Sequence, residues 1–156
     1  MKCLQSKRKN ISNKIIEVKV NGDCMSPEIN NGDVVNIYKY YSLPKVGDVV
    51  LLLDENNCFR LHRIVKISND KYYIKGDNSY FFDNVVSIET IVGFYKLGSE
   101  YKNNNLIMLL TKLSYLVGEL STITRDTKDE FYVTIADNIL KQIIIIKRKI
   151  KEYEYK

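Results

Sequence analysis

Short apolar runs alternate with polar turn residues from Lys14 to about Leu97, and this pattern predicts β-strands. The runs are rich in Val, Ile and Tyr, and Gly, Asn, Asp and Pro separate them. No run with helical periodicity lies between them. Strands that follow one another this closely predict a coiled or barrel-like antiparallel sheet. The runs are IIEVKV, DVVNIYKY, DVVLLL, FRLHRIVKI and KYYIKG.

The spacing of apolar residues changes after Tyr101 to the period of an α-helix. The stretch NNNLIMLLTKLSYLVGEL predicts a short apolar helix that follows an Asn-rich N-cap region. Thr127 and Glu130 match a capping box, which predicts the start of a second helix. We expect the apolar faces of both helices to pack on the β domain or on a partner chain rather than on lipid. The predicted face of the second helix contains Phe131, Ile135, Ile139, Ile143, Ile146 and Ile150.

Length and composition predict a soluble globular protein with one main domain. The chain has 156 residues, of which 45% are hydrophobic and 28% are charged. We divide it into a basic N-terminal tail (1–14), a β domain (15–100) and a C-terminal helical appendage (101–156). The net charge of +5 is concentrated at the two ends, where basic residues more often improve solubility than recognise a ligand. We therefore predict no nucleic acid among the partners.

Segments typical of export are not recognised in the sequence. The basic N-terminus lacks the apolar region of a signal peptide, and the runs VVLLL and IIII are too short to cross a bilayer. Three cysteines, an odd number without paired spacing, favour a reducing compartment. These observations predict a cytoplasmic protein without a transmembrane segment.

Two residues with nucleophile and base chemistry stand out. Cys24 lies between turn-forming residues in NGDCMSPE, and His62 is the single histidine of the chain. Each residue alone is a weak signal, because most free cysteines and lone histidines are structural. Cys58 and His62 are four residues apart, but on a strand this separates them by about 13 Å, too far to share a metal ion. We predict neither a metal nor a cofactor.

The order of five spaced motifs resembles the signal-peptidase and LexA-like serine peptidase superfamily over residues 17–95. These motifs are GDCMSP, GDVV, VGDVVLL, LHRIV and IKGDNSYFFD. His62-Arg63-Ile64 is similar to the motif of the branch with a histidine base, found in endoplasmic-reticulum and archaeal signal peptidases. The resemblance implies a mainly β protein, with a signal-peptidase/LexA-like coiled antiparallel fold followed here by two C-terminal α-helices.

The resemblance also implies a catalytic triad in which Cys24 replaces the serine nucleophile of the family. His62 is then the general base. Asp83, six residues after the Asp of Lys-Gly-Asp, is the acid, with Asp77 as the fallback. Thiols ionise more easily than hydroxyls, so a Cys-His-acid triad is a workable variant. The resemblance implies supporting roles for Met25, Pro27, Arg63, Gly76 and Asp77.

The implied function is that of a soluble intracellular peptidase that cleaves a specific peptide or a leader segment. The C-terminal helices are expected to recruit the substrate or a partner protein. One alternative is a catalytically inactive domain that binds an extended peptide or a partner, and another is a cysteine introduced to weaken the enzyme. A self-cleaving LexA-type repressor is less favoured, because about twenty residues precede the core and the base is histidine.

Overall fold

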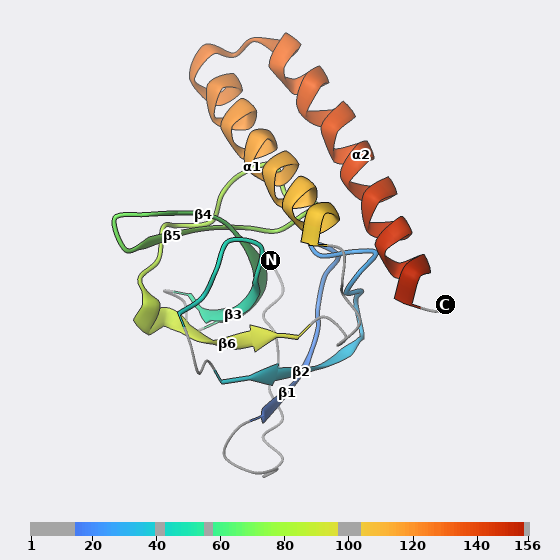
Figure 1. Cartoon of the computed structure of the whole chain (residues 1–156). Helices are drawn as coiled ribbons and strands as arrows, with labels where there is room; N and C mark the ends of the chain where they lie inside the picture. Colours follow the sequence, from blue (N-terminus) through green and yellow to red (C-terminus); the bar gives the residue numbers. More distant parts are fainter. Residues whose placement is uncertain (1–14, 40–42, 55–57, 97–103, 155–156) are drawn as a thin grey trace.

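The computed structural model describes residues 15–39, 43–54, 58–96 and 104–154, in which a six-stranded antiparallel sheet precedes two helices (Figure 1). The predicted fold class, mainly β with two C-terminal helices, is confirmed. The proposed basic tail, 1–14, lies outside the described residues. The strands are β1 (Ile15–Lys19), β2 (Val34–Tyr38), β3 (Val49–Leu53), β4 (Phe59–Ser68), β5 (Lys71–Lys75) and β6 (Ile91–Tyr95), and a 3₁₀ turn, η1 (Ile88–Thr90), precedes β6.

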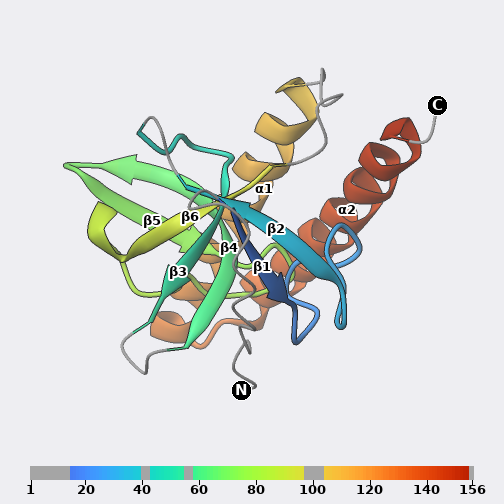
Figure 2. The same ribbon diagram turned by 90° about the horizontal axis from the view of Figure 1, so that it is seen from below.

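The sheet coils so that β1 and β4, which are not neighbours in it, share a core. Its strand order is β1-β2-β6-β3-β4-β5. Val18 of β1 and Leu61 of β4 nevertheless belong to one buried cluster, although three strands separate them in the sheet. Figure 2 shows that the strands of the sheet cross one another. Side chains of a strand point alternately to its two faces, so central β3 contributes Leu51 to this cluster and Leu52 to a second cluster on the other face.

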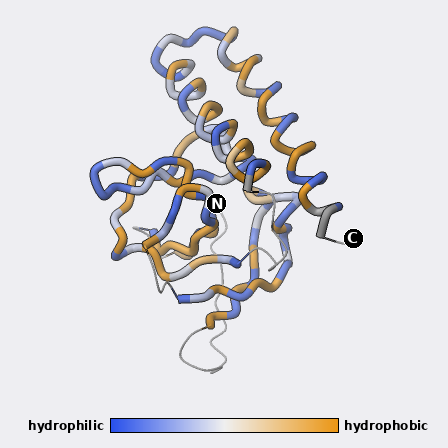
Figure 3. Tube along the Cα trace, in the orientation of Figure 1, coloured by the Kyte–Doolittle hydropathy of each residue, from blue (hydrophilic) through white to orange (hydrophobic). Residues whose placement is uncertain are grey.

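Two long helices, α1 (Asn104–Thr127) and α2 (Glu130–Glu154), form a hairpin that packs beside β4 and β5 (Figure 1). Apolar and polar residues alternate along both helices, as expected for helices with one buried face (Figure 3). The apolar faces meet each other in a core of their own. It contains Leu110, Val117, Ala136, Leu140 and Ile143.

The first helix is longer than the sequence pattern indicated. The pattern ended at Leu120, whereas α1 continues to Thr127 through a stretch rich in Ser and Thr. Hydroxyls in this stretch donate hydrogen bonds to the carbonyl oxygen four residues earlier, for example Ser121 to Val117 at 2.7 Å. A hydroxyl satisfied in this way leaves the helical backbone intact. Because these residues have low hydrophobicity, the apolar pattern did not predict the last two turns of α1.

The predicted capping box of α2 is wrong. Thr127 still belongs to α1, and the Asp129 carboxylate accepts the hydrogen bond of the Phe131 N–H at 2.9 Å. Asp is a preferred N-cap residue, so the helix starts two residues later than the box implied. The predicted buried face is confirmed in part: Phe131 is 64% exposed, whereas Ile143 and Ile150 are buried and Ile139 and Ile146 pack against the helical core. The residues that α2 buries are Ala136, Leu140, Ile143, Lys147 and Ile150.

Within the part of the chain that the structure describes, one helix has the length and composition of a membrane span. Residues 105–127 of α1 pass this test, although 33% of the most apolar window is buried in the protein. The prediction of no spanning segment rested on uninterrupted apolar runs and stays a prediction, because this criterion uses length and composition alone. Core helices of soluble proteins pass the same test, and here α1 packs on α2, β4 and β5.

Candidate active site

Cys24 lies in the loop that connects β1 to β2. The Gly22 N–H donates to Asn31 Oδ1 at 3.0 Å and holds the two ends of this loop together. Gly22 has a φ of 110°, a conformation that glycine adopts without strain. Further along the loop, the peptide bond between Ser26 and Pro27 is cis. The predicted turn around Cys24 is therefore a closed loop of defined conformation.

Three separate segments bring Cys24, His62 and Asp83 together. Cys24 Sγ lies 3.1 Å from His62 Nε2, and His62 Nδ1 is hydrogen-bonded to Asp83 Oδ2. His62 belongs to β4 and is only 7% exposed. Asp83 follows β5. Its N–H donates to the carbonyl of Ile74 in β5 at 2.8 Å, and this hydrogen bond holds Asp83 against that strand. This is the geometric order of a nucleophile, a base and an orienting acid.

Two opposed effects act on the pKa of His62. Burial lowers this pKa, but the hydrogen bonds to Asp83 and Cys24 and the negative charge of Asp83 together raise it to about 9. Hydrogen bonds and opposite charges favour the protonated ring more than burial disfavours it. The site therefore holds a protonated imidazole near neutral pH, which is the partner that a thiolate requires.

The raised pKa of His62 makes the stability of the protein depend on pH. Because the folded value, about 9, exceeds the unfolded value of about 6.5, His62 stabilises the fold fully below pH 6.5. This contribution, on the order of 3 kcal/mol, is lost as the pH rises towards 9. We expect the free energy of urea unfolding to fall over this range in the wild type. The fall should be absent in His62→Gln, and an equal fall in both proteins would contradict the assignment.

Gly76 leaves no room for a side chain beside the pair. A Cβ at this position would lie 3.0 Å from Cys24 Cβ and 3.0 Å from His62 Nε2. It would also lie 2.6 Å from Ser79 Oγ. The Gly76 singled out in the sequence therefore permits the close approach of the β5 end to the candidate nucleophile and base.

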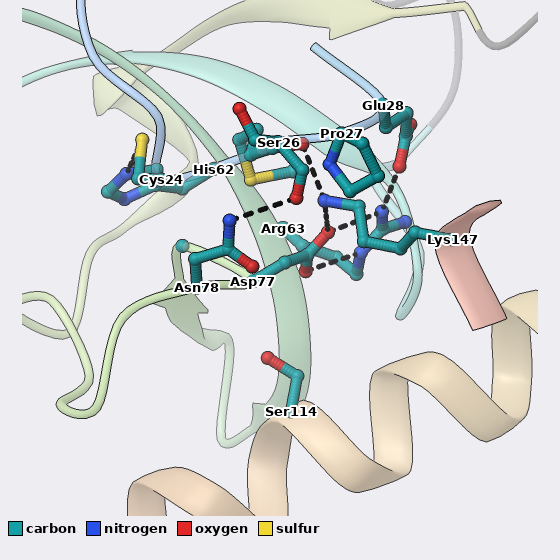
Figure 4. Close-up of polar contacts among 12 residues, drawn as sticks. Cys24, Ser26, Pro27, Glu28, His62, Arg63, Asp77, Asn78, Ser114 and Lys147 are labelled. Atoms are coloured by element: carbon teal, nitrogen blue, oxygen red, sulfur yellow. Dashed lines mark hydrogen bonds and ion pairs between the residues drawn. The ribbon is translucent and has the colours of Figure 1, made fainter. Parts of the chain in front are cut away.

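A buried ionic cluster lies beside the site (Figure 4). Arg63 donates to both carboxylate oxygens of Asp77 at 3.0 and 2.9 Å, and to Glu28 at 2.9 Å. Lys147 Nζ lies 3.0 Å from Asp77. Burial alone would raise the pKa of Asp77, but Arg63 and Lys147 hold it well below its usual range. Burial raises the pKa of Glu28 despite its ion pair with Arg63.

The fallback acid predicted from sequence, Asp77, does not contact His62. Its two oxygens bind Arg63 and Lys147, whereas Asp83 is the carboxylate at the histidine ring. Arg63 acts as a structural partner of Asp77 and also donates to the Gly47 carbonyl at 2.9 Å. The supporting role of both residues is to join the β5 end to the core.

The remaining candidates, Met25 and Pro27, shape the nucleophile loop. Met25 is 1% exposed and packs in the first core cluster. Pro27 follows the cis bond, and its carbonyl accepts a hydrogen bond from the Asn30 side chain at 3.2 Å. Ser26 Oγ bonds to Asn30 at 3.0 Å and does not face His62. These contacts leave Cys24 as the loop residue that faces the histidine.

Sequence reasoning missed three residues that organise the site. Asn78 Nδ2 donates to the Asp23 and Ser26 carbonyls, both at 2.9 Å, and so clamps the nucleophile loop. Arg60 lies 3.5 Å from Asp83 on the cleft side. Lys147 belongs to the basic C-terminal end of the chain, for which the sequence pattern predicted a role in solubility. Its position on the buried face of α2, where apolar residues recur, was the signal that could have revealed it.

A cleft of about 610 Å³ opens onto the three residues. Its walls come from the β1–β2 loop, the start of β4 and residues 79–83. Arg60 and Asp54, which form an ion pair at 2.8 Å, supply charged groups at its edge. The cleft has room for several residues of an extended peptide beside Cys24. Its apolar lining includes Val20, Met25, Ile29, Phe59, Leu61 and Phe81.

The N-terminal part of the chain matches a known protein family. Residues 2–95 match the family model described as Peptidase S24-like, which is more than half of the chain. The match ends at the last residue of β6, so the helical hairpin lies outside it. No curated protein and no solved structure matches the chain.

Proposed function

The chain belongs to the Peptidase S24-like family, and on this premise we propose that it is an endopeptidase with a cysteine nucleophile. The observation that carries the proposal is the chain of contacts from Cys24 Sγ to His62 and from His62 to Asp83. We assign the histidine-base chemistry of the signal-peptidase-like branch to this chain on the same contacts. The family match supports the peptidase fold, and the contacts support the catalytic roles.

Each residue of the triad has one role in the proposed reaction. In the resting pair Cys24 has already passed its proton to His62 Nε2, and its thiolate sulfur attacks the carbonyl carbon of the scissile bond. His62 then gives this proton to the departing amine, which leaves a thioester on Cys24. Water attacks the thioester while His62 takes a proton from it, the C–S bond then breaks to release the carboxylic acid product, and the proton on His62 is shared again with the Cys24 sulfur as in the resting pair. Asp83 holds the Nδ1–H of His62 throughout and stabilises its charged form.

We propose that the substrate binds as an extended segment along the cleft. The apolar lining favours hydrophobic side chains next to the scissile bond. We expect the main chain of the peptide to pair with the sheet edge at β1, an edge strand that is followed by the cleft residues Val20 and Asn21. The negative charge that develops on the carbonyl oxygen is expected to bind the backbone N–H of Cys24. A leader segment as substrate and a cytoplasmic location both stay predictions.

Incubation with a library of proteome-derived peptides at pH 7 under reducing conditions tests the proposal. New peptide termini are identified by mass spectrometry in the wild type and in Cys24→Ala. We expect cleavages that share a common residue pattern around the cut and that disappear in Cys24→Ala. Identical termini in the two folded proteins would contradict an active peptidase and favour a domain that binds peptides without cutting them.

A further inference from the structure

The helical hairpin, which lies outside the family match, is bonded to the loop that contains Cys24. Lys147 of α2 is 1% exposed, and its Nζ donates to the Met25 carbonyl at 2.5 Å. The same nitrogen lies 3.0 Å from Asp77. Burying a lysine costs free energy unless its charge is paired, and Asp77 pairs it here. Lys147 thereby connects α2 to the residue next to Cys24 (Figure 4).

The hairpin also holds the segment that carries Asp83. Tyr80 donates from its hydroxyl to the Asp137 carboxylate of α2 at 2.5 Å. Phe82 packs against Gly118 of α1 so closely that a Cβ there would lie 2.4 Å from the ring. Both contacts lie within three residues of Asp83. They restrict the segment from which Asp83 reaches His62.

A third connection reaches the strand end behind the pair. Lys75 Nζ donates to Ser114 Oγ of α1 at 3.3 Å and to the Gly76 carbonyl at 3.0 Å. Gly76 lies beside the pair, since a Cβ at this position would lie 3.0 Å from both Cys24 Cβ and His62 Nε2. Each of the three segments around His62 therefore has its own bond to the hairpin.

We propose that Lys147 and Asp137 are positioning residues, and that the hairpin holds Cys24 and Asp83 in register with His62. This inference rests on the proposed function and assigns the hairpin to the active site rather than to substrate recruitment alone. Neither residue lines the cleft, so they act through the loops that they hold. A shift of about 1 Å between reacting groups can cost on the order of 100-fold in rate.

Alkylation of Cys24 by iodoacetamide measures this positioning without a known substrate. The full-length wild type, Lys147→Met and Asp137→Ala are treated between pH 5 and 9, and the rate at Cys24 is followed by mass spectrometry. Two exposed neighbours on α2 provide the matched controls Lys149→Met and Asn138→Ala. Circular dichroism and thermal melting establish that each variant is folded at the assay temperature.

We expect both variants to react at Cys24 at least about tenfold more slowly than the wild type near pH 6.5, while the controls match it. If Lys147→Met does not fold, the alkylation rate of Asp137→Ala alone tests the inference. If the folded variants alkylate Cys24 at the wild-type rate at every pH, the inference is wrong. It is also wrong if the fraction of unfolded protein accounts for the slower alkylation. If Cys24 is alkylated at the same rate in the wild type and in His62→Gln, the proposed function is wrong instead. The two failures are therefore distinct.

Discussion

Replacing His62 with glutamine is expected to lower the rate of peptide cleavage by about 10²–10⁴-fold. Glutamine occupies a similar volume and can still donate a hydrogen bond to Asp83, but it cannot accept the proton of Cys24. Without that transfer the thiol remains a weak nucleophile, and no acid protonates the leaving amine. The peptide identified by Cys24-dependent cleavage serves as the substrate, with kcat and KM measured separately.

The loss should fall on kcat, because His62 takes part in the chemical step more than in ground-state binding. Lys66 provides a control on the same strand, since its side chain contacts Tyr115 on the face of the helices. Lys66→Met should cleave the peptide at close to the wild-type rate. Unchanged kcat in a folded His62→Gln protein would remove His62 from the mechanism.

Replacing Arg63 with methionine is expected to lower the free energy of unfolding by about 3–5 kcal/mol. Arg63 is completely buried and bonds to Asp77, Glu28 and the Gly47 carbonyl. Methionine is apolar and cannot donate these bonds. Glu28 would then lose the arginine that compensates its buried charge, and Asp77 would keep only Lys147. A loss of this size is a large part of the total stability of a small protein.

Urea unfolding followed by circular dichroism measures the effect. The exposed ion pair between Arg125 and Asp126, at 3.7 Å, provides the control. Arg125→Met should cost no more than about 1 kcal/mol, because solvent screens exposed pairs. An Arg63→Met protein as stable as the wild type would show that the buried cluster contributes nothing net to the fold.

The order of motifs in the sequence predicted the contacts at His62 because those motifs are short and local. A turn around Cys24, a strand through His62 and a second turn before Asp83 can each be recognised within ten residues. The resemblance to the peptidase superfamily then indicated that these three residues form a triad. The fold class followed from short apolar runs separated by turn residues, and this pattern is also local.

The role of α2 could not be predicted in this way. Lys147 and Met25 are 122 residues apart in sequence, and no local pattern specifies that a helical lysine will reach a loop carbonyl. A cap also depends on single hydrogen bonds, so Asp129 could replace the predicted Thr127 without any change in the apolar pattern. Long-range polar contacts of this kind are determined by packing, which the sequence pattern does not contain.

The pH dependence of Cys24 alkylation in the presence and absence of His62 tests the central claim most directly. Limiting iodoacetamide is added to folded wild type and to His62→Gln between pH 5 and 9, and modification of Cys24 is quantified by mass spectrometry. A thiolate paired with the imidazolium predicts fast reaction at pH 6–7 in the wild type, and loss of this advantage in His62→Gln. Equal rates at Cys24 in the two proteins over this range would contradict the proposed nucleophile and base.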